Sequence, residues 1–144
     1  MKRKLAAILS ASAEGYSRLM GEDEAGTLQT LKGRRQVMCS LIEKHQGRVV
    51  DTTGDNLLAE FASVVDALEC AVEIQKELKK RDEELTKECR MPFRIGIHLG
   101  DVIEEEGKIY GDGVRVAVLL DSLADAGGIC VSRSAHDQVK NKLD

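Results

Sequence analysis

Short apolar runs alternate with longer amphipathic stretches along this chain, and their periods predict a mixed α and β domain. The first run, Lys4 to Ala11, is continuous and short, which is typical of a buried strand. Gly15 to Met20 is predicted to form a short helix. Glu22 to His45 is predicted to form a longer helix, because its apolar residues recur near helical spacing. Gly47 follows as a terminating glycine.

A hairpin and a second long helix are predicted next. Arg48 to Thr53 and Leu57 to Phe61 flank a turn that contains Gly-Asp, so they are predicted to pair. Ser63 with Asp66 three positions later is close to a capping box, with Asp in place of Glu. The helix that starts there is predicted to run to Arg90, with a heavily charged and solvated second half.

The last third of the chain is predicted to alternate short strands and helices. The strands are Phe93 to Leu99, Asp101 to Glu105 and Ile129 to Val131, and the helices are Gly113 to Leu123 and Ser134 to Lys142. The whole order predicts an α+β fold class, a ferredoxin-like palm (βααββαβ) with a short C-terminal βαβα extension. In that fold the end of the first strand lies beside the central hairpin turn. Residues near positions 12 and 55 are therefore predicted to be neighbours.

Side chains at those two strand ends could carry phosphoryl-transfer chemistry. Paired carboxylates there could hold two Mg²⁺ ions that stabilise the attacking and leaving oxygens. Glu14, Gly15, Tyr16 and Ser17 lead from the first strand into a helix, whose backbone N–H groups would form a phosphate cradle. A simple tight turn at Gly15 explains that glycine equally well.

Composition narrows the classes of function. The chain has 144 residues, of which 42% are hydrophobic and 32% charged, and this balance predicts one globular domain. Its net charge is −4 and its basic residues are interleaved with acidic ones, which argues against nucleic-acid binding. No apolar run approaches the ~18 residues of a membrane span. The start has no defensible signal cleavage site, so the protein is predicted to be cytoplasmic.

Cysteine and histidine spacing does not predict a zinc site. A zinc site needs clustered ligands. These residues are instead dispersed: Cys39, Cys70, Cys89, Cys130, His45, His98 and His136.

Five segments carry a family resemblance. They are Ala-Ile-Leu-Ser-Ala-x-x-Glu-Gly-Tyr-Ser-Arg-Leu-Met (7–20), Thr-Gly-Asp-x-Leu-Leu-Ala-Glu-Phe (53–61), Arg-Ile-Gly-Ile-His-Leu-Gly-Asp-Val (94–102), Ile-Tyr-Gly-Asp-Gly-Val (109–114) and Gly-Gly-Ile-Cys-Val-Ser (127–132). In this order they resemble the catalytic domain of bacterial class III adenylate and guanylate cyclases. Diguanylate cyclases share the palm-like fold, but their Gly-Gly-Asp/Glu-Glu-Phe turn is absent from this sequence.

The resemblance implies a reaction and an assembly. The family converts a nucleoside triphosphate, here expected to be ATP, into a 3′,5′-cyclic nucleotide and pyrophosphate with Mg or Mn. Its site is shared by two chains in a head-to-tail dimer. One chain supplies two metal-binding aspartates, and the other supplies purine-selecting residues with an Asn and an Arg that stabilise the transition state. Residues 1–144 are expected to form one such domain, truncated at the C-terminus, because the family continues with a strand pair that carries a phosphate-binding Lys.

The metal-binding positions depart from the family pattern. The second metal aspartate falls on Asp55, but the first falls on Ser12. A hydroxyl with one carboxylate is a weak site for a hard dication, which favours anionic oxygen ligands. A single Mg²⁺ could still arrive bound to the triphosphate.

The positions that the family uses for the transition state and for purine selection also differ. The transition-state Asn falls on Arg115 and the Arg on Leu119, which can donate no hydrogen bond. Losing one such donor costs on the order of 3–4 kcal/mol of transition-state stabilisation. The purine-selecting Lys falls on Asp51 and the Asp on Lys108, so the charges are exchanged. That pair could still contact a base, or the two residues could be ordinary surface charges.

Three functions remain open on the sequence. The leading hypothesis is a cyclase domain with the family fold that is catalytically impaired or inactive. A second is an active adenylate cyclase that works with atypical residues or with a complementing partner chain. A third is a regulatory module that senses a nucleotide or docks a partner.

Overall fold

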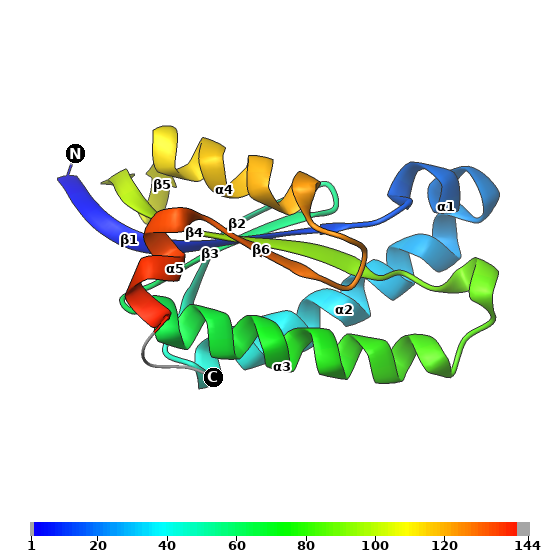
Figure 1. Cartoon of the computed structure of the whole chain (residues 1–144). Helices are drawn as coiled ribbons and strands as arrows, with labels where there is room; N and C mark the ends of the chain where they lie inside the picture. Colours follow the sequence, from blue (N-terminus) through cyan, green and yellow to red (C-terminus); the bar gives the residue numbers. More distant parts are fainter. Residues whose placement is uncertain (1, 141–144) are drawn as a thin grey trace.

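The computed structural model describes residues 2–140, which form one sheet with helices on both of its faces (Figure 1). The strands are β1 (Lys2–Ala13), β2 (Arg48–Thr53), β3 (Asn56–Phe61), β4 (Phe93–Glu105), β5 (Lys108–Tyr110) and β6 (Ile129–Val131). The helices are α1 (Tyr16–Glu22), α2 (Glu24–Lys44), α3 (Val64–Glu83), α4 (Asp112–Leu123) and α5 (Arg133–Val139), with a 3₁₀ turn at Lys87–Cys89.

The strand order confirms the predicted fold class. Within residues 2–140 the sheet runs β2-β3-β1-β4-β5, with each strand antiparallel to its neighbour. β6 lies parallel to β4 and pairs with residues 95–97, while β5 pairs with residues 103–105 of the same strand. The order β2-β3-β1-β4 is that of a ferredoxin-like βααββαβ unit, and β5, α4, β6 and α5 form the extension.

The strands differ from the prediction in two places. The segments 93–99 and 101–105 are one continuous strand, β4, because Gly100 keeps its place in the ladder opposite Ala6 of β1. The prediction also missed β5, which is only three residues long and therefore too short to show an alternating pattern.

Several helix boundaries differ from the predicted ones for local reasons. The helix predicted from Glu22 begins instead after Asp23, whose side chain caps it by accepting a hydrogen bond from Gly26 N at 3.0 Å. α3 ends at Glu83 and not at Arg90, before the 3₁₀ turn. The last helix ends at Val139, and its predicted end at Lys142 lies outside the described residues. Over residues 2–140, no helix combines the length and apolar character needed to cross a membrane.

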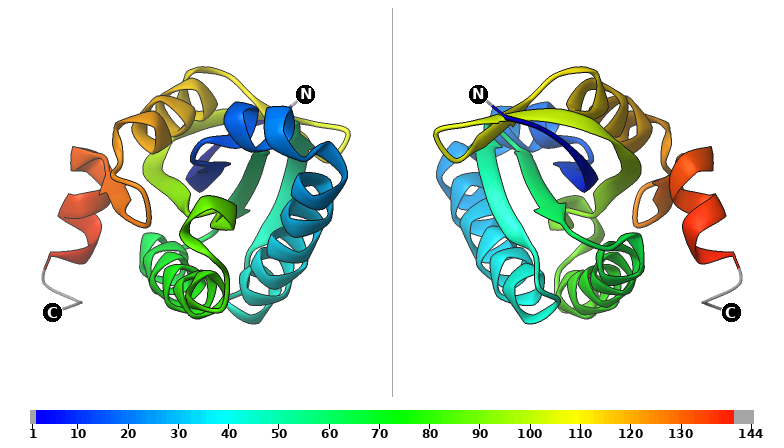
Figure 2. Two further views of the ribbon diagram at one scale, coloured as in Figure 1. Left: turned by 90° about the vertical axis from the view of Figure 1, so that its right-hand side faces the viewer. Right: turned by 90° about the vertical axis from the view of Figure 1, so that its left-hand side faces the viewer.

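Alternate side chains of β1 point to two different cores, as the period of a strand requires. Ala7, Leu9 and Ala11 are fully buried against α2 and α3, which lie side by side under one face of the sheet (Figure 2). Ala6 and Ile8 pack on the other face in a smaller cluster that includes Ala117 of α4.

Within residues 2–140, α4 is the helix that packs on the middle of this second face, and it lies very close to the sheet. A Cβ atom on Gly96 of β4 would approach the carbonyl oxygen of Ala117 to 2.6 Å, so the helix backbone rests directly on the strand. This contact sets α4 over the end of β1 where the candidate site lies.

Candidate functional site

The hairpin turn between β2 and β3 lies against the end of β1. Thr53 pairs with Asn56, which leaves Gly54 and Asp55 as a two-residue turn. Gly54 adopts a φ of +59°, a left-handed conformation that glycine takes without strain. The backbone N–H of Ala13 donates a hydrogen bond to Asp55 Oδ2 at 3.1 Å. The predicted proximity of positions 12 and 55 is therefore confirmed.

A buried carboxyl group, that of Asp121, lies next to this strand end. It projects from α4 toward the sheet and is 4% exposed. Its Oδ2 accepts hydrogen bonds from the hydroxyls of Ser10 at 2.6 Å and Ser12 at 3.0 Å. Asn56 of β3 donates to the same two hydroxyl oxygens, at 2.9 and 3.0 Å. Two strands, β1 and β3, and one helix, α4, thus meet in one polar cluster. We call Ser10, Ser12, Asn56 and Asp121 the Asp121 cluster.

Burial and hydrogen bonding act on Asp121 in opposite directions. Burial raises the pKa of its carboxyl group because the charged form loses solvation, and the nearby Asp55 carboxylate raises it as well. The Ser10 and Ser12 hydroxyls and the Arg94 guanidinium oppose that rise in pKa. The Ser12 hydroxyl, which is partly exposed, thus donates to a neighbouring carboxyl group.

Arg94 of β4 stands beside this cluster, opposite Ser12 in the β1–β4 register. Its guanidinium forms an ion pair with Glu14 and donates a hydrogen bond from Nη1 to the carbonyl oxygen of Ser122 at 3.1 Å. It links the segment after β1 to the last turn of α4.

The four residues of the predicted phosphate cradle face different surroundings. Gly15 has a φ of +71° and starts α1, and its carbonyl oxygen accepts a hydrogen bond from Leu19 N at 3.0 Å. Tyr16 packs against the main core, whereas Ser17 is exposed. The Glu14 carboxylate forms an ion pair with Arg94. This segment therefore offers backbone groups at the strand end but no free cation of its own.

Arg115 and Leu119 lie on the outward face of α4, one turn apart. Arg115 pairs with Asp112 of the same helix, with its Nη2 2.7 Å from Oδ1. Leu119 is 50% exposed, and Val118 and Leu123 add further exposed apolar surface beside it. Ala117 and Asp121 point the other way, into the sheet.

Asp51 and Lys108 lie on β2 and β5, and within residues 2–140 no ion pair joins them. Their sequence neighbours Val50 and Ile109 pack in the same small cluster under α4. Asp51 and Lys108 therefore each follow or precede a residue of this apolar cluster, but they do not form an ion pair with each other.

Comparison with known proteins assigns the family. Residues 3–143 match the family model of the adenylate and guanylate cyclase catalytic domain. The chain belongs to this family. It is 42% identical over 145 residues to a protein named putative adenylate cyclase 3 of Rhizobium meliloti; the match covers 100% of this chain and 25% of that protein.

Solved structures of cyclase domains share the fold. A crystal structure titled adenylate/guanylate cyclase/hydrolase, from Silicibacter pomeroyi, superposes with a TM-score of 0.87 at 39% identity, covering 100% of this chain and 84% of that one. The adenylyl cyclase CyaB of P. aeruginosa superposes at 0.84 and 22% identity over 99% of this chain and 84% of that one, which is a likeness of fold alone. This chain therefore spans most of the solved domains but only a quarter of the curated relative.

The residues of this cyclase domain do not fit a protein-held pair of divalent ions. No group of three His, Cys, Asp or Glu side chains within the described residues could hold a metal. Asp55 is the one carboxylate at the hairpin turn, and Ser12 donates its hydroxyl hydrogen to Asp121. Hard dications need several oxygen ligands, preferably anionic.

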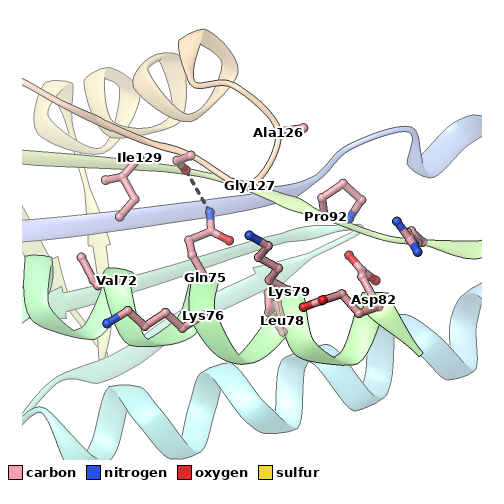
Figure 3. Close-up of a pocket in the computed structure, with 13 residues that line it drawn as sticks. Val72, Gln75, Lys76, Leu78, Lys79, Asp82, Pro92, Ala126, Gly127 and Ile129 are labelled. Carbon is pink, nitrogen blue, oxygen red and sulfur yellow. Dashed lines mark hydrogen bonds between the residues drawn. The ribbon is translucent and has the colours of Figure 1, made fainter. Parts of the chain in front are cut away.

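A cleft of about 610 Å³ lies elsewhere on the cyclase domain, between α3 and residues 126–129 (Figure 3). Gln75 crosses it and donates hydrogen bonds to the carbonyl oxygens of Phe93 at 3.0 Å and Gly128 at 2.9 Å. None of the predicted site residues lines this cleft. The chemistry expected from the sequence is therefore not located there.

Sequence reasoning missed four residues of this region: Ser10, Asn56, Arg94 and Asp121. A signal existed for the serines, because Ser10 and Ser12 alternate on one face of an otherwise apolar strand. Asp121 also follows Ala117 by one helical turn, on the apolar side of α4. A polar residue on a buried face needs a polar partner, and this rule joins the two elements.

Proposed function

We propose that this domain has the class III nucleotide cyclase architecture with little or no cyclase activity. The observation that carries the proposal is the hydrogen bond from Ser12, at the first metal position, to the buried Asp121 carboxyl at 3.0 Å. A carboxylate at position 12 would offer anionic oxygens to an incoming metal ion. A hydroxyl that is already hydrogen-bonded offers none.

The outward face of α4 supports the same conclusion. Leu119 stands where the family has its transition-state Arg and is exposed without any polar group. Arg115, one turn away, is paired with Asp112 and would have to exchange that partner to reach a developing charge. Absence of one preorganised donor lowers the rate about 10²–10³-fold, and losses at several positions do not simply add.

The ligand and the assembly are part of the proposal. The ligand class is a nucleoside triphosphate, ATP in the first instance, and the partner is a second copy in head-to-tail arrangement. The exposed apolar side chains of Val118, Leu119 and Leu123 support a contact between copies along α4. The described residues, 2–140, hold no complete metal site, so a divalent ion would have to arrive bound to the triphosphate.

The direct test is a cyclase assay on purified protein. Mg-ATP and Mn-ATP, and GTP in parallel, are incubated with the protein, and cyclic nucleotide is quantified against a heat-inactivated sample. We expect no product above that control. Cyclic AMP clearly above it would refute the proposal and favour an active cyclase with atypical residues.

A gain-of-function variant tests whether the substituted positions account for the inactivity. Ser12→Asp, Arg115→Asn and Leu119→Arg together restore the family pattern, and we expect measurable cyclic AMP from this variant. The matched control replaces Leu119→Arg by Leu123→Arg, which adds the same charge one turn further along α4. Equal activity in the two variants would show that the position of the arginine is irrelevant.

A further inference from the structure

The ion pair between Glu14 and Arg94 lies at the end of β1, where Arg94 stands opposite Ser12 in the sheet. Both side chains are partly open to solvent, at 40% and 32% of their area. The Arg94 guanidinium also donates to Ser122 O, so its position between β1 and α4 is fixed from two sides. An anion that approached Ser12 and Asp55 would meet this guanidinium while Glu14 already holds it.

Acidic and basic side chains both gather at this edge of the sheet. Glu14, Asp55 and Asp121 place carboxyl groups there, against the guanidinium groups of Arg94 and Arg35. Arg35 donates to the carbonyl oxygen of Gly54 in the hairpin turn. Each of these two guanidinium groups therefore already contacts an oxygen of the chain, although neither Nε atom makes a hydrogen bond.

We propose that the Glu14 carboxylate competes with phosphate for the Arg94 guanidinium. It thereby lowers the affinity of this site for free polyphosphates. The proposal rests on the proposed function, because it takes the ligand to be a nucleoside triphosphate. Arginine binds phosphate in the same bidentate manner as it binds a carboxylate. A tethered carboxylate is present at high effective concentration, so a phosphate from solution must displace it.

The contact is displaceable. An ion pair with this much exposure contributes little to stability, commonly less than about 1 kcal/mol. Removing the Glu14 charge should therefore leave the fold intact. It would release Arg94 and also remove a negative charge that repels the ligand.

Inorganic tripolyphosphate is the probe, because it has the phosphate chain of ATP and no base. It is titrated calorimetrically into the wild-type chain, Glu14→Gln, Arg94→Gln and the double variant at low salt without divalent ions. We expect Glu14→Gln to bind about three- to tenfold more tightly than wild type. The double variant should lose that gain, because the released cation is gone.

The matched control is Glu77→Gln, which removes a carboxylate from an exposed pair with Arg81 on α3, a helix on the opposite face of the sheet from α4. Thermal melting of each variant checks that the chain is folded. The proposal is overturned if Glu14→Gln binds like wild type, if Glu77→Gln gains as much, or if the gain survives in the double variant. Absence of binding in every folded variant also overturns it.

Failure of this inference can be told apart from failure of the proposed function. Cyclic AMP production by the wild-type chain would refute the proposed function but leave the tripolyphosphate comparison unchanged. Conversely, an inactive wild type with equal tripolyphosphate affinity in Glu14→Gln would refute only the role of Glu14.

Discussion

Ser10 and Asp121 show how one hydrogen bond can join distant parts of this chain. The Ser10 hydroxyl lies 2.6 Å from a carboxyl oxygen that is almost completely buried on α4. A buried carboxyl group without donors is costly, so the serine does more than fill space on β1.

Ser10→Ala should destabilise the domain by about 1–3 kcal/mol, because it removes a donor to a buried carboxyl group. Urea unfolding followed by circular dichroism measures the change. Ser122→Ala is the control, since its exposed hydroxyl donates a hydrogen bond to Leu119 O within α4 and not to a buried carboxyl group. We expect the control to stay within about 0.5 kcal/mol of wild type. Equal effects would mean that the Asp121 cluster has no special stability.

His98 is expected to give the domain a pH-dependent contribution to stability. Burial lowers the pKa of its imidazole, against the opposing charge of Asp112, and its Nδ1 lies 2.9 Å from Ser132 Oγ. A depressed pKa means that the folded state binds fewer protons than the unfolded chain. The stabilising contribution is therefore complete above the ordinary histidine pKa of about 6.5 and is lost as pH falls below it.

Replacing His98 by Gln should flatten this dependence. We expect the unfolding free energy of wild type to fall more than that of His98→Gln between about pH 7.5 and pH 5.5. Chemical unfolding at both pH values measures the difference. Exposed His136, replaced in the same way, serves as the comparison. Parallel pH profiles for wild type and His98→Gln would contradict the assignment.

At the scale of elements, the contact between β4 and α4 is made possible by glycine. A Cβ on Gly96 would lie 2.6 Å from Ala117 O and 2.8 Å from the carbonyl carbon of Leu120, and both are backbone atoms. Backbone cannot yield as a flexible side chain does, so any larger residue must move the helix.

Gly96→Ala should therefore destabilise the domain by about 1–3 kcal/mol through overpacking. Gly33→Ala in α2 is the matched change, because nothing lies within 4 Å of its added Cβ. There we expect a gain of about 0.5–1 kcal/mol from improved helix propensity. Thermal melting compares the two, and a stable Gly96→Ala would show that α4 is free to shift.

Elements were more predictable than their boundaries. The main strands and helices carry strong periodic patterns, and the split βααββαβ order follows from their sequence alone. β5 and the uninterrupted course of β4 depend on pairing across the sheet, which one segment does not reveal. The Asp121 cluster was missed for the same reason, because Ser12 and Asp121 meet only once α4 is placed.

At the scale of the whole molecule, a buried ion pair connects the two long helices. Arg34 of α2 and Asp82 of α3 are about nine-tenths buried, and Asp82 also accepts a hydrogen bond from Met91 N at 3.0 Å. This pair therefore fixes α2, α3 and the approach to β4 at once. Removing either partner would leave a buried charge without compensation.

Asp82→Ala should lower the free energy of unfolding by about 3–5 kcal/mol, because it leaves the Arg34 guanidinium unpaired in the interior. Urea unfolding at constant protein concentration measures the loss. The neighbouring Glu83→Ala removes an exposed carboxylate from the same turn and should change stability by less than about 0.5 kcal/mol. A small effect of Asp82→Ala would show that Arg34 finds water or another partner.

β1 stands between β3 and β4 in the sheet, yet it precedes both of them in the chain. Its second neighbour is complete only at Glu105, about ninety residues later, or roughly 5–20 seconds at ordinary rates of synthesis. During that interval β1, an apolar strand that is buried on both faces in the folded domain, cannot pair with β4. The nascent chain is therefore expected to depend on a chaperone more than a domain of this size with local strand pairing.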